Sequence, residues 1–146
     1  IVLEWFNPDC PFVKYAHESG PLEEMPAKWK EEDVVWIAIN SGASSKLGAS
    51  PVKNVKAVME WKMRYPLLFD PTGEGGKLYK ATTTPHMFVI DEDFTLRYSG
   101  ALDNAPMGER KGEYRNYVEE AIEAISKGAL CPKGDEPYGC GVKYAD

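Results

Sequence analysis

Cysteine and histidine are scarce in this sequence of 146 residues, which contains three of the first and two of the second. No two cysteines have the CxxC spacing of a zinc site, and the two histidines are far apart in the sequence. Three cysteines, an odd number, also exclude a small scaffold held together by disulfides. We therefore expect neither a metal nor another cofactor.

Long apolar runs and an excess of basic residues are missing as well. No run approaches the roughly 18 apolar residues that cross a bilayer, so the sequence predicts no membrane span. A net charge of −6 disfavours nucleic acid as a partner, because phosphate contacts require a basic face. The chain starts without Met inside an apolar run, so we expect a missing upstream segment. The sequence does not distinguish a cytoplasmic from a periplasmic or secreted location.

What is present is the composition of an ordinary globular protein, with 43% apolar and 27% charged residues. The length suits one domain. The sequence has no internal repeats and no low-complexity tracts. Glycine and proline become frequent towards the C-terminus, and we expect a folded domain over residues 1–128 followed by a tail over residues 129–146 that carries two cysteines.

Strand and helix signals alternate along the chain. Apolar runs predict strands at residues 1–6, 34–39, 67–69, 87–90 and 96–98. Helical periodicity and breakers predict helices at residues 10–19, 22–32, 51–64, 76–81 and 113–127. A strand–helix–strand crossover returns the chain in the same direction, whereas the hairpin near residue 90 adds antiparallel strands. The prediction is a three-layer α/β domain with a mixed central sheet flanked by helices.

Two of the predicted helices have apolar residues at three- and four-residue spacing, which predicts the face that each buries. In the helix at 51–64 these residues are Val52, Val55, Val58, Met59 and Met63. In the last helix they are Tyr114, Tyr117, Val118, Ala121, Ile122 and Ile125.

Cys10 is the first candidate for chemistry, because it follows a predicted strand and precedes Pro11 at the start of a helix. Free N–H groups and the helix dipole stabilise a thiolate there, with pKa values lowered from about 8.5 to roughly 3.5–7.5. The alternative is a cysteine packed as a small apolar residue. The neighbouring Pro8, Asp9 and Pro11 disfavour a dry core position.

The second candidate is the segment of Thr84, Pro85 and His86 directly before an apolar strand. The proline marks either a loop boundary or a cis peptide bond in a tight turn. His86 either lies near the thiolate and polarises it or is a histidine at the edge of a strand.

Together these segments resemble the thioredoxin superfamily over nearly all of the chain. The run from Leu3 to Val13 is similar to the strand and active-site turn of that family, with Cys10 at the first cysteine of its CxxC motif. Thr84 and Pro85 are similar to the cis-proline loop that faces this cysteine. The helix and strand over residues 51–69 resemble an insertion of the redoxin branch, which includes the alkyl hydroperoxide reductase and TlpA-like proteins. The nearest resemblance is to a peroxiredoxin-like subgroup with a single active-site cysteine.

The resemblance implies a thiol–disulfide oxidoreductase in which Cys10 is the nucleophile and Pro11, Thr84, Pro85 and His86 line the substrate site. Its partners would be protein or small-molecule thiols and disulfides, with an external reductant. A non-enzymatic module that binds extended peptide beside Pro85 is the alternative, and peroxide reduction is the third.

Three departures from the family pattern matter. Val13 occupies the place of the second CxxC cysteine, so that resolving thiol is missing. Asn7 stands where peroxiredoxins have Thr, and their reactive cysteine corresponds to the second CxxC position, not the first. The N-terminal hairpin of the family is also missing from the sequence, which would leave an edge of the sheet uncovered.

Cys131 and Cys140 leave three options open. They can form a local disulfide that braces the tail, since the glycines and prolines between them let the chain turn back. Cys140 can instead reach Cys10 and act as its resolving thiol. Both can also be reduced cysteines without a role.

Overall fold

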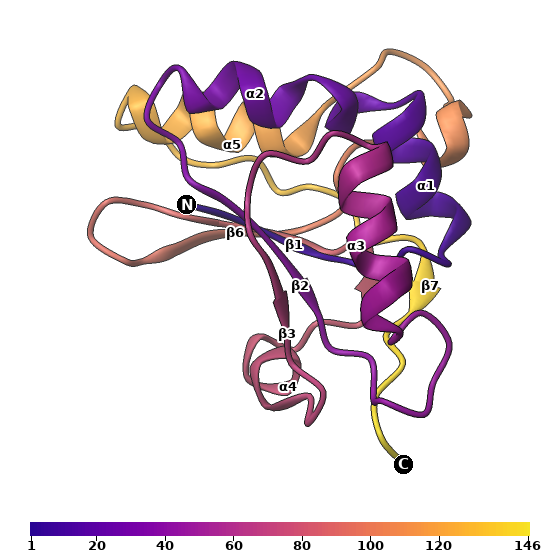
Figure 1. The fold of residues 1–146 in the computed structure, drawn as a ribbon. Helices are drawn as coiled ribbons and strands as arrows, with labels where there is room; N and C mark the ends of the chain where they lie inside the picture. Colours follow the sequence, from indigo (N-terminus) through magenta and orange to yellow (C-terminus); the bar gives the residue numbers. More distant parts are fainter.

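A five-stranded sheet with the strand order β3-β2-β1-β5-β6 forms the centre of the computed structural model, which describes all of residues 1–146 (Figure 1). Its strands are β1 (Val2–Trp5), β2 (Trp36–Asn40), β3 (Leu67–Phe69), β5 (Met87–Ile90) and β6 (Leu96–Gly100). β1, β2 and β3 run parallel, and β5 is antiparallel to both β1 and β6. The predicted mixed sheet is confirmed.

The helices are α1 (Pro11–Glu18), α2 (Met25–Lys30), α3 (Pro51–Glu60), α4 (Glu74–Tyr79) and α5 (Tyr117–Ser126), with short 3₁₀ turns at Pro21–Glu23 and Pro106–Gly108. Side chains alternate between the two faces of a sheet, so the buried clusters show which helix covers which face. One face packs against α1, α2, α3 and α5, and the other against residues at the end of α4. Figure 1 shows α2 and α5 together on one side of the sheet and α4 on the opposite side.

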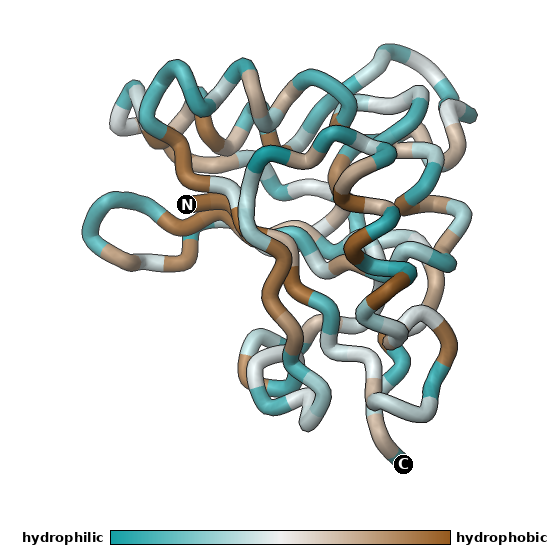
Figure 2. The backbone as a smooth tube through the Cα atoms, viewed as in Figure 1, coloured by the Kyte–Doolittle hydropathy of each residue, from teal (hydrophilic) through white to brown (hydrophobic).

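Hydropathy follows this arrangement. In Figure 2 the hydrophobic colour is concentrated on the central strands, and the outer turns of the helices are mostly hydrophilic. The largest buried cluster joins β1, β2, β5 and β6 to α2 and α5. No helix combines the length and the apolar character that crossing a bilayer requires.

The predicted apolar face of the helix at 51–64 is confirmed only in part, since Met63, beyond the end of α3, is buried and Val58 packs against the cluster around Cys10. Val52 is 77% exposed and Met59 is 74% exposed, whereas the side chains that α3 buries are Asn54 and Ala57. Asn54 donates to the carbonyl oxygens of Gly48 and Ser50 and accepts from the Asn40 amide, at 2.8–2.9 Å. A polar interior holds this helix against the loop after β2, and periodicity of apolar residues cannot reveal such an interior.

The last helix starts later than predicted. The Asn116 side chain accepts a hydrogen bond from the Glu119 N–H at 3.0 Å and caps α5, which begins at Tyr117. Tyr114 therefore lies outside the helix, contrary to the prediction, and its hydroxyl donates to Asp103. The second helix is also shorter than predicted, because the 3₁₀ turn at Pro21–Glu23 precedes α2.

The C-terminal tail contributes a strand of its own. β7 (Cys140–Gly141) pairs antiparallel with β4 (Thr83–Thr84), the segment that leads into Pro85. This two-stranded sheet fixes the tail beside the N-terminus of α1, as Figure 1 shows.

Candidate active site

Cys10 lies between the end of β1 and the first residue of α1. Pro11 occupies the first helical position, where the absence of an N–H costs no hydrogen bond. The Cys10 carbonyl accepts from the Lys14 N–H at 2.9 Å, so this residue is the N-cap of the helix. Its side chain is only 1% exposed, which contradicts the expectation that the flanking prolines and Asp9 keep it out of the core.

The cis-proline loop lies against this cysteine. The Thr84–Pro85 peptide bond is cis, as the resemblance implied. The Cys10 thiol donates to the carbonyl oxygen of Thr84 at 3.1 Å, and Thr84 and Pro85 are both buried. Two segments that are far apart in the sequence thus meet at one sulfur atom.

Cys140 approaches the same place from the tail. It is the β-pairing partner of Thr84 in β7, and it packs against the buried cluster that contains Cys10. The residue before it has to be glycine, because a Cβ on Gly139 would lie 2.0 Å from the Thr84 carbonyl oxygen and the backbone φ is +141°. The structure therefore brings Cys140 to Cys10 at the cis-proline loop.

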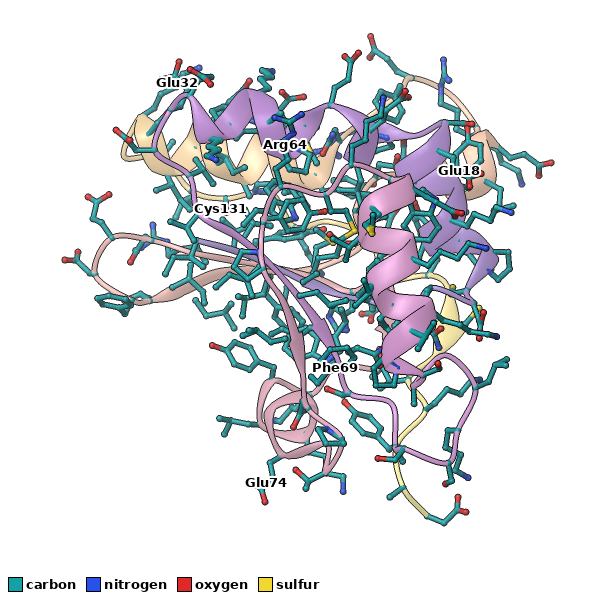
Figure 3. The ribbon with its side chains drawn as sticks, in the orientation of Figure 1. Glu18, Glu32, Arg64, Phe69, Glu74 and Cys131 are labelled. Carbon is teal, nitrogen blue, oxygen red and sulfur yellow. The ribbon has the colours of Figure 1, made fainter.

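Cys131 lies elsewhere. It packs against the large cluster formed with α5, and its thiol is 3.6 Å from the carbonyl oxygen of Ala121. Figure 3 shows it near α5, away from the site of β7 in Figure 1. All three cysteines are free thiols, so the structure contains no local disulfide between Cys131 and Cys140.

The pKa values of the two neighbouring thiols are shifted in opposite directions. Burial alone would raise the pKa of Cys10, but hydrogen bonds from the Cys140 thiol, from Thr84 and from the N–H groups of Val13 and Cys140 outweigh it, so the pKa is lowered. Burial and the adjacent Cys10 raise the pKa of Cys140 to about 11. Cys10 is therefore the thiol that ionises first, and Cys140 is its proton-bearing neighbour.

The Thr84 hydroxyl is a further polar group at the sulfur. It is buried and makes no hydrogen bond while Cys10 is a thiol that donates to the Thr84 carbonyl. Once Cys10 is ionised, this hydroxyl can donate to the thiolate, which is one of the contacts that lower the Cys10 pKa. A buried hydroxyl without a hydrogen-bond partner costs free energy. A thiolate beside it supplies that partner, so the hydroxyl stabilises the ionised form of Cys10.

His86 and Pro11, the other two residues predicted to line the substrate site, differ in burial. Pro11 is exposed at the rim of the site. His86 is buried, and its two ring nitrogens contact the Thr82 N–H at 3.2 Å and the Ser99 hydroxyl at 3.1 Å. Burial lowers the pKa of His86 to about 4, so its ring is neutral near pH 7. Neither nitrogen hydrogen-bonds to Cys10, and the ring stacks on Phe88 instead.

A buried polar cluster around Glu4, under α1, was not predicted from the sequence. Glu4 on β1 is fully buried, and its carboxylate contacts His17 at 2.6 Å, Tyr65 at 3.0 Å and Trp36 at 3.2 Å. The signal for it was one charged residue inside the apolar run over residues 1–6. Its partners come from three other elements of the sequence, so no local motif could reveal them.

The residues that the structure describes contain no group of three or more His, Cys, Asp or Glu side chains that could hold a metal ion. The polar groups at Cys10 are thiols, a hydroxyl and backbone groups. This set suits sulfur chemistry.

Comparison with known proteins gives matches among solved structures alone, since no family model and no curated protein matches the chain. An uncharacterized conserved protein from Geobacillus kaustophilus is 27% identical, with a TM-score of 0.88 over 99% of this chain and 76% of that chain. A thioredoxin-like protein in its oxidized form is 15% identical, with a TM-score of 0.66 over 88% of this chain and 78% of that one. The chain has the thioredoxin-like fold.

A third solved structure has the same fold. It is a putative thiol:disulfide interchange protein DsbE from Chlorobium tepidum, which is 22% identical with a TM-score of 0.57 over 88% of this chain and 78% of that chain. In this thioredoxin-like fold, the strand that ends before Cys10 is central and the cis-proline loop follows α4. The predicted fold class is therefore confirmed, whereas none of these matches shows the peroxiredoxin-like subgroup.

Proposed function

We propose that this protein is a thiol–disulfide oxidoreductase in which Cys10 is the nucleophile and Cys140 is the resolving thiol. The observation that carries the proposal is the placement of these two thiols side by side at the cis-proline loop, with the pKa of one lowered and that of the other raised. The thiolate is the reactive form in disulfide exchange, so the difference assigns the order of attack. The shared fold with a putative thiol:disulfide interchange protein supports the same reaction class.

The proposed reaction has two exchange steps. The Cys10 thiolate attacks one sulfur of an external disulfide, so that a mixed disulfide forms and the other external sulfur leaves as a thiolate. Cys140 then loses its proton and attacks the Cys10 sulfur, which forms the Cys10–Cys140 disulfide and releases the second external thiolate. Two protein thiols are oxidised and one external disulfide is reduced to two thiols. An external thiol reductant returns the protein to its starting state.

The raised pKa of Cys140 fits this order. Burial is its first cause, and the neighbouring Cys10 is the second. Formation of the mixed disulfide removes the charge on Cys10, and with it the repulsion that holds the proton on Cys140. The second thiol is therefore activated once it is needed. Val13 occupies the position one turn along α1 where a CxxC motif would have its resolving thiol, so Cys140 takes that role from the tail.

The test is disulfide exchange with a small aromatic disulfide and with insulin, together with mass mapping of the oxidised protein. Wild type should release two external thiols per chain and contain a Cys10–Cys140 disulfide. Cys10→Ser should lose all exchange, whereas Cys140→Ser should stop at the mixed disulfide after one released thiol. Cys131→Ser is the matched control and should behave as wild type. Full exchange in Cys10→Ser would overturn the proposal, because the C-terminal cysteines would then carry the chemistry. No exchange by wild type would leave the non-enzymatic binding module as the better interpretation.

Peroxide reduction is a second candidate, favoured by the unpartnered Thr84 hydroxyl beside the sulfur. A hydroxyl there could hydrogen-bond a peroxide oxygen. In this reaction the Cys10 thiolate attacks one oxygen of hydrogen peroxide, the O–O bond breaks, and a Cys10 sulfenic acid and a hydroxide ion result. The proton that Cys10 released to the solvent on ionisation converts the hydroxide to water. Condensation with the Cys140 thiol then gives the same disulfide and a second water. The test is peroxide consumption by wild type and by Thr84→Val. Consumption by wild type that falls in Thr84→Val would support this activity, and no consumption by wild type would exclude it.

A further inference from the structure

The tail segment around β7 is held by a tyrosine on each side of Cys140. On the C-terminal side, the Tyr144 hydroxyl donates to the Ala81 carbonyl at 2.8 Å. On the N-terminal side, the Tyr138 hydroxyl donates to the Asp103 carboxylate at 2.6 Å. Between them, β7 pairs with β4, and the Val142 N–H donates to the Thr82 carbonyl at 3.1 Å. Cys140 thus lies on a short strap with an anchor at either end.

Asp103 is an unusual anchor because it is a buried carboxylate, only 2% exposed. It accepts hydrogen bonds from the hydroxyls of Tyr138 and Tyr114 and from the N–H of Ala105, the last two at 3.0 Å. Burial and the charge of Asp103 raise the pKa of both tyrosines, so both hydroxyls stay protonated and able to donate. Charge-assisted hydrogen bonds of this kind are stronger than neutral ones.

Tyr138 also contacts the helix that carries the nucleophile. Its ring centroid lies 5.9 Å from that of Phe12, two residues after Cys10. Tyr138 is itself two residues before Cys140. One side chain therefore connects the start of α1, the tail strand and the buried carboxylate after β6.

The geometry points to Tyr138 and Asp103 as positioning residues that dock Cys140 over Cys10. This inference rests on the proposed exchange function and adds to it the group that sets the rate of the second step. A resolving thiol on a tail acts at an effective concentration that depends on how much of the time the tail is docked. The docked tail also packs against the cluster that contains Cys10 and so contributes to the burial of this residue.

Two rates must then change in opposite directions when the anchor is weakened. A tail that is docked less of the time closes the Cys10–Cys140 disulfide more slowly. The same tail leaves Cys10 open more of the time, so a reagent in solution reaches it faster. A change in thiol acidity alone would not produce this opposite pair, and a variant that loses another hydrogen bond to the same carboxylate controls for a general loss of stability.

The chain offers a matched pair of variants. Tyr138→Phe removes the hydroxyl and keeps the ring against Phe12. Tyr114→Phe removes the other hydroxyl from the same carboxylate but lies outside the tail. Release of the second thiol from the aromatic disulfide reports closure, and iodoacetamide labelling of the Cys10 peptide in the Cys140→Ser background reports access.

We expect closure in Tyr138→Phe to slow by about tenfold and labelling of Cys10 to quicken by about the same factor, the effect of losing one hydrogen bond to a charged group. Tyr114→Phe should stay within about twofold of wild type in both rates, because the hydrogen bond that this variant removes does not involve the tail. Asp103→Asn is a second variant for the case in which Tyr138→Phe fails to fold, and it should move both rates in the same directions as Tyr138→Phe.

An unchanged closure rate in Tyr138→Phe, equal effects in Tyr114→Phe, or two rates that fall together would overturn the positioning role. If wild type itself forms no Cys10–Cys140 disulfide, the proposed function fails instead, so the two failures are distinguishable.

Discussion

At the scale of single residues, the acidity of Cys10 depends on the neighbour that the tail supplies. Burial raises the pKa of this thiol, and the first contact that lowers it again is the hydrogen bond from the Cys140 side chain. The helix N-terminus, which the sequence predicts as the group that stabilises the thiolate, contributes through the Val13 N–H. The thiolate is thus stabilised by Cys140, a residue near the opposite end of the sequence. A local sequence motif cannot indicate such a contact.

Replacing Cys140 should therefore change the pH dependence of Cys10. In Cys140→Ala the side-chain donor is lost, so the Cys10 pKa should rise and the pH midpoint of its iodoacetamide labelling should move upward. Cys140→Ser keeps a hydroxyl donor and should shift the midpoint less. The direction follows because a lost donor destabilises the charged form. A midpoint that falls or stays constant in Cys140→Ala would show that the thiol pair does not interact.

At the scale of elements, the sequence predicts strands better than it predicts how helices pack. β1, β2 and the β5–β6 hairpin follow their apolar runs, because a buried strand needs little more than apolar side chains and turns. α3 mostly fails the same test, since Val52, Val55 and Met59 are exposed and Asn54 is buried. A helix of ten residues can be held by a few specific hydrogen bonds, and these are invisible to periodicity.

Asn54 should therefore matter more to stability than the apolar residues of α3. Asn54→Ala removes the acceptor of the buried Asn40 amide and two donors to backbone carbonyls, so we expect a loss of about 2–3 kcal/mol in the free energy of unfolding. Val55→Ala, on the exposed face, should cost less than about 0.5 kcal/mol. Urea denaturation of both variants tests this, and a larger loss in Val55→Ala would mean that the exposed face is buried in solution.

At the scale of the whole molecule, the site is assembled from three places in the chain. Cys10 comes from the first β–α junction, Thr84 and Pro85 come from the middle, and Cys140 comes from the tail. The resemblance placed the first two together, because their residues form recognisable segments. The position of Cys140 stayed open between three options, since the tail has turn residues but no periodicity. What decided it was the pairing of β7 with β4, a contact between segments that are distant in sequence.

Oxidation of Cys10 and Cys140 would close almost the whole chain into one loop. Long loops lose the most conformational entropy in the unfolded state when a disulfide joins their ends, an effect of about 4–5 kcal/mol for loops of roughly a hundred residues. Because the two cysteines already lie together in the reduced fold, little of this gain should be lost to distortion. We expect the oxidised protein to unfold at a clearly higher urea concentration than the reduced one. Cys131→Ser should show the same difference, and Cys140→Ser should show none. Equal stability of the two redox forms of wild type would mean that the disulfide strains the native structure as much as it restricts the unfolded chain.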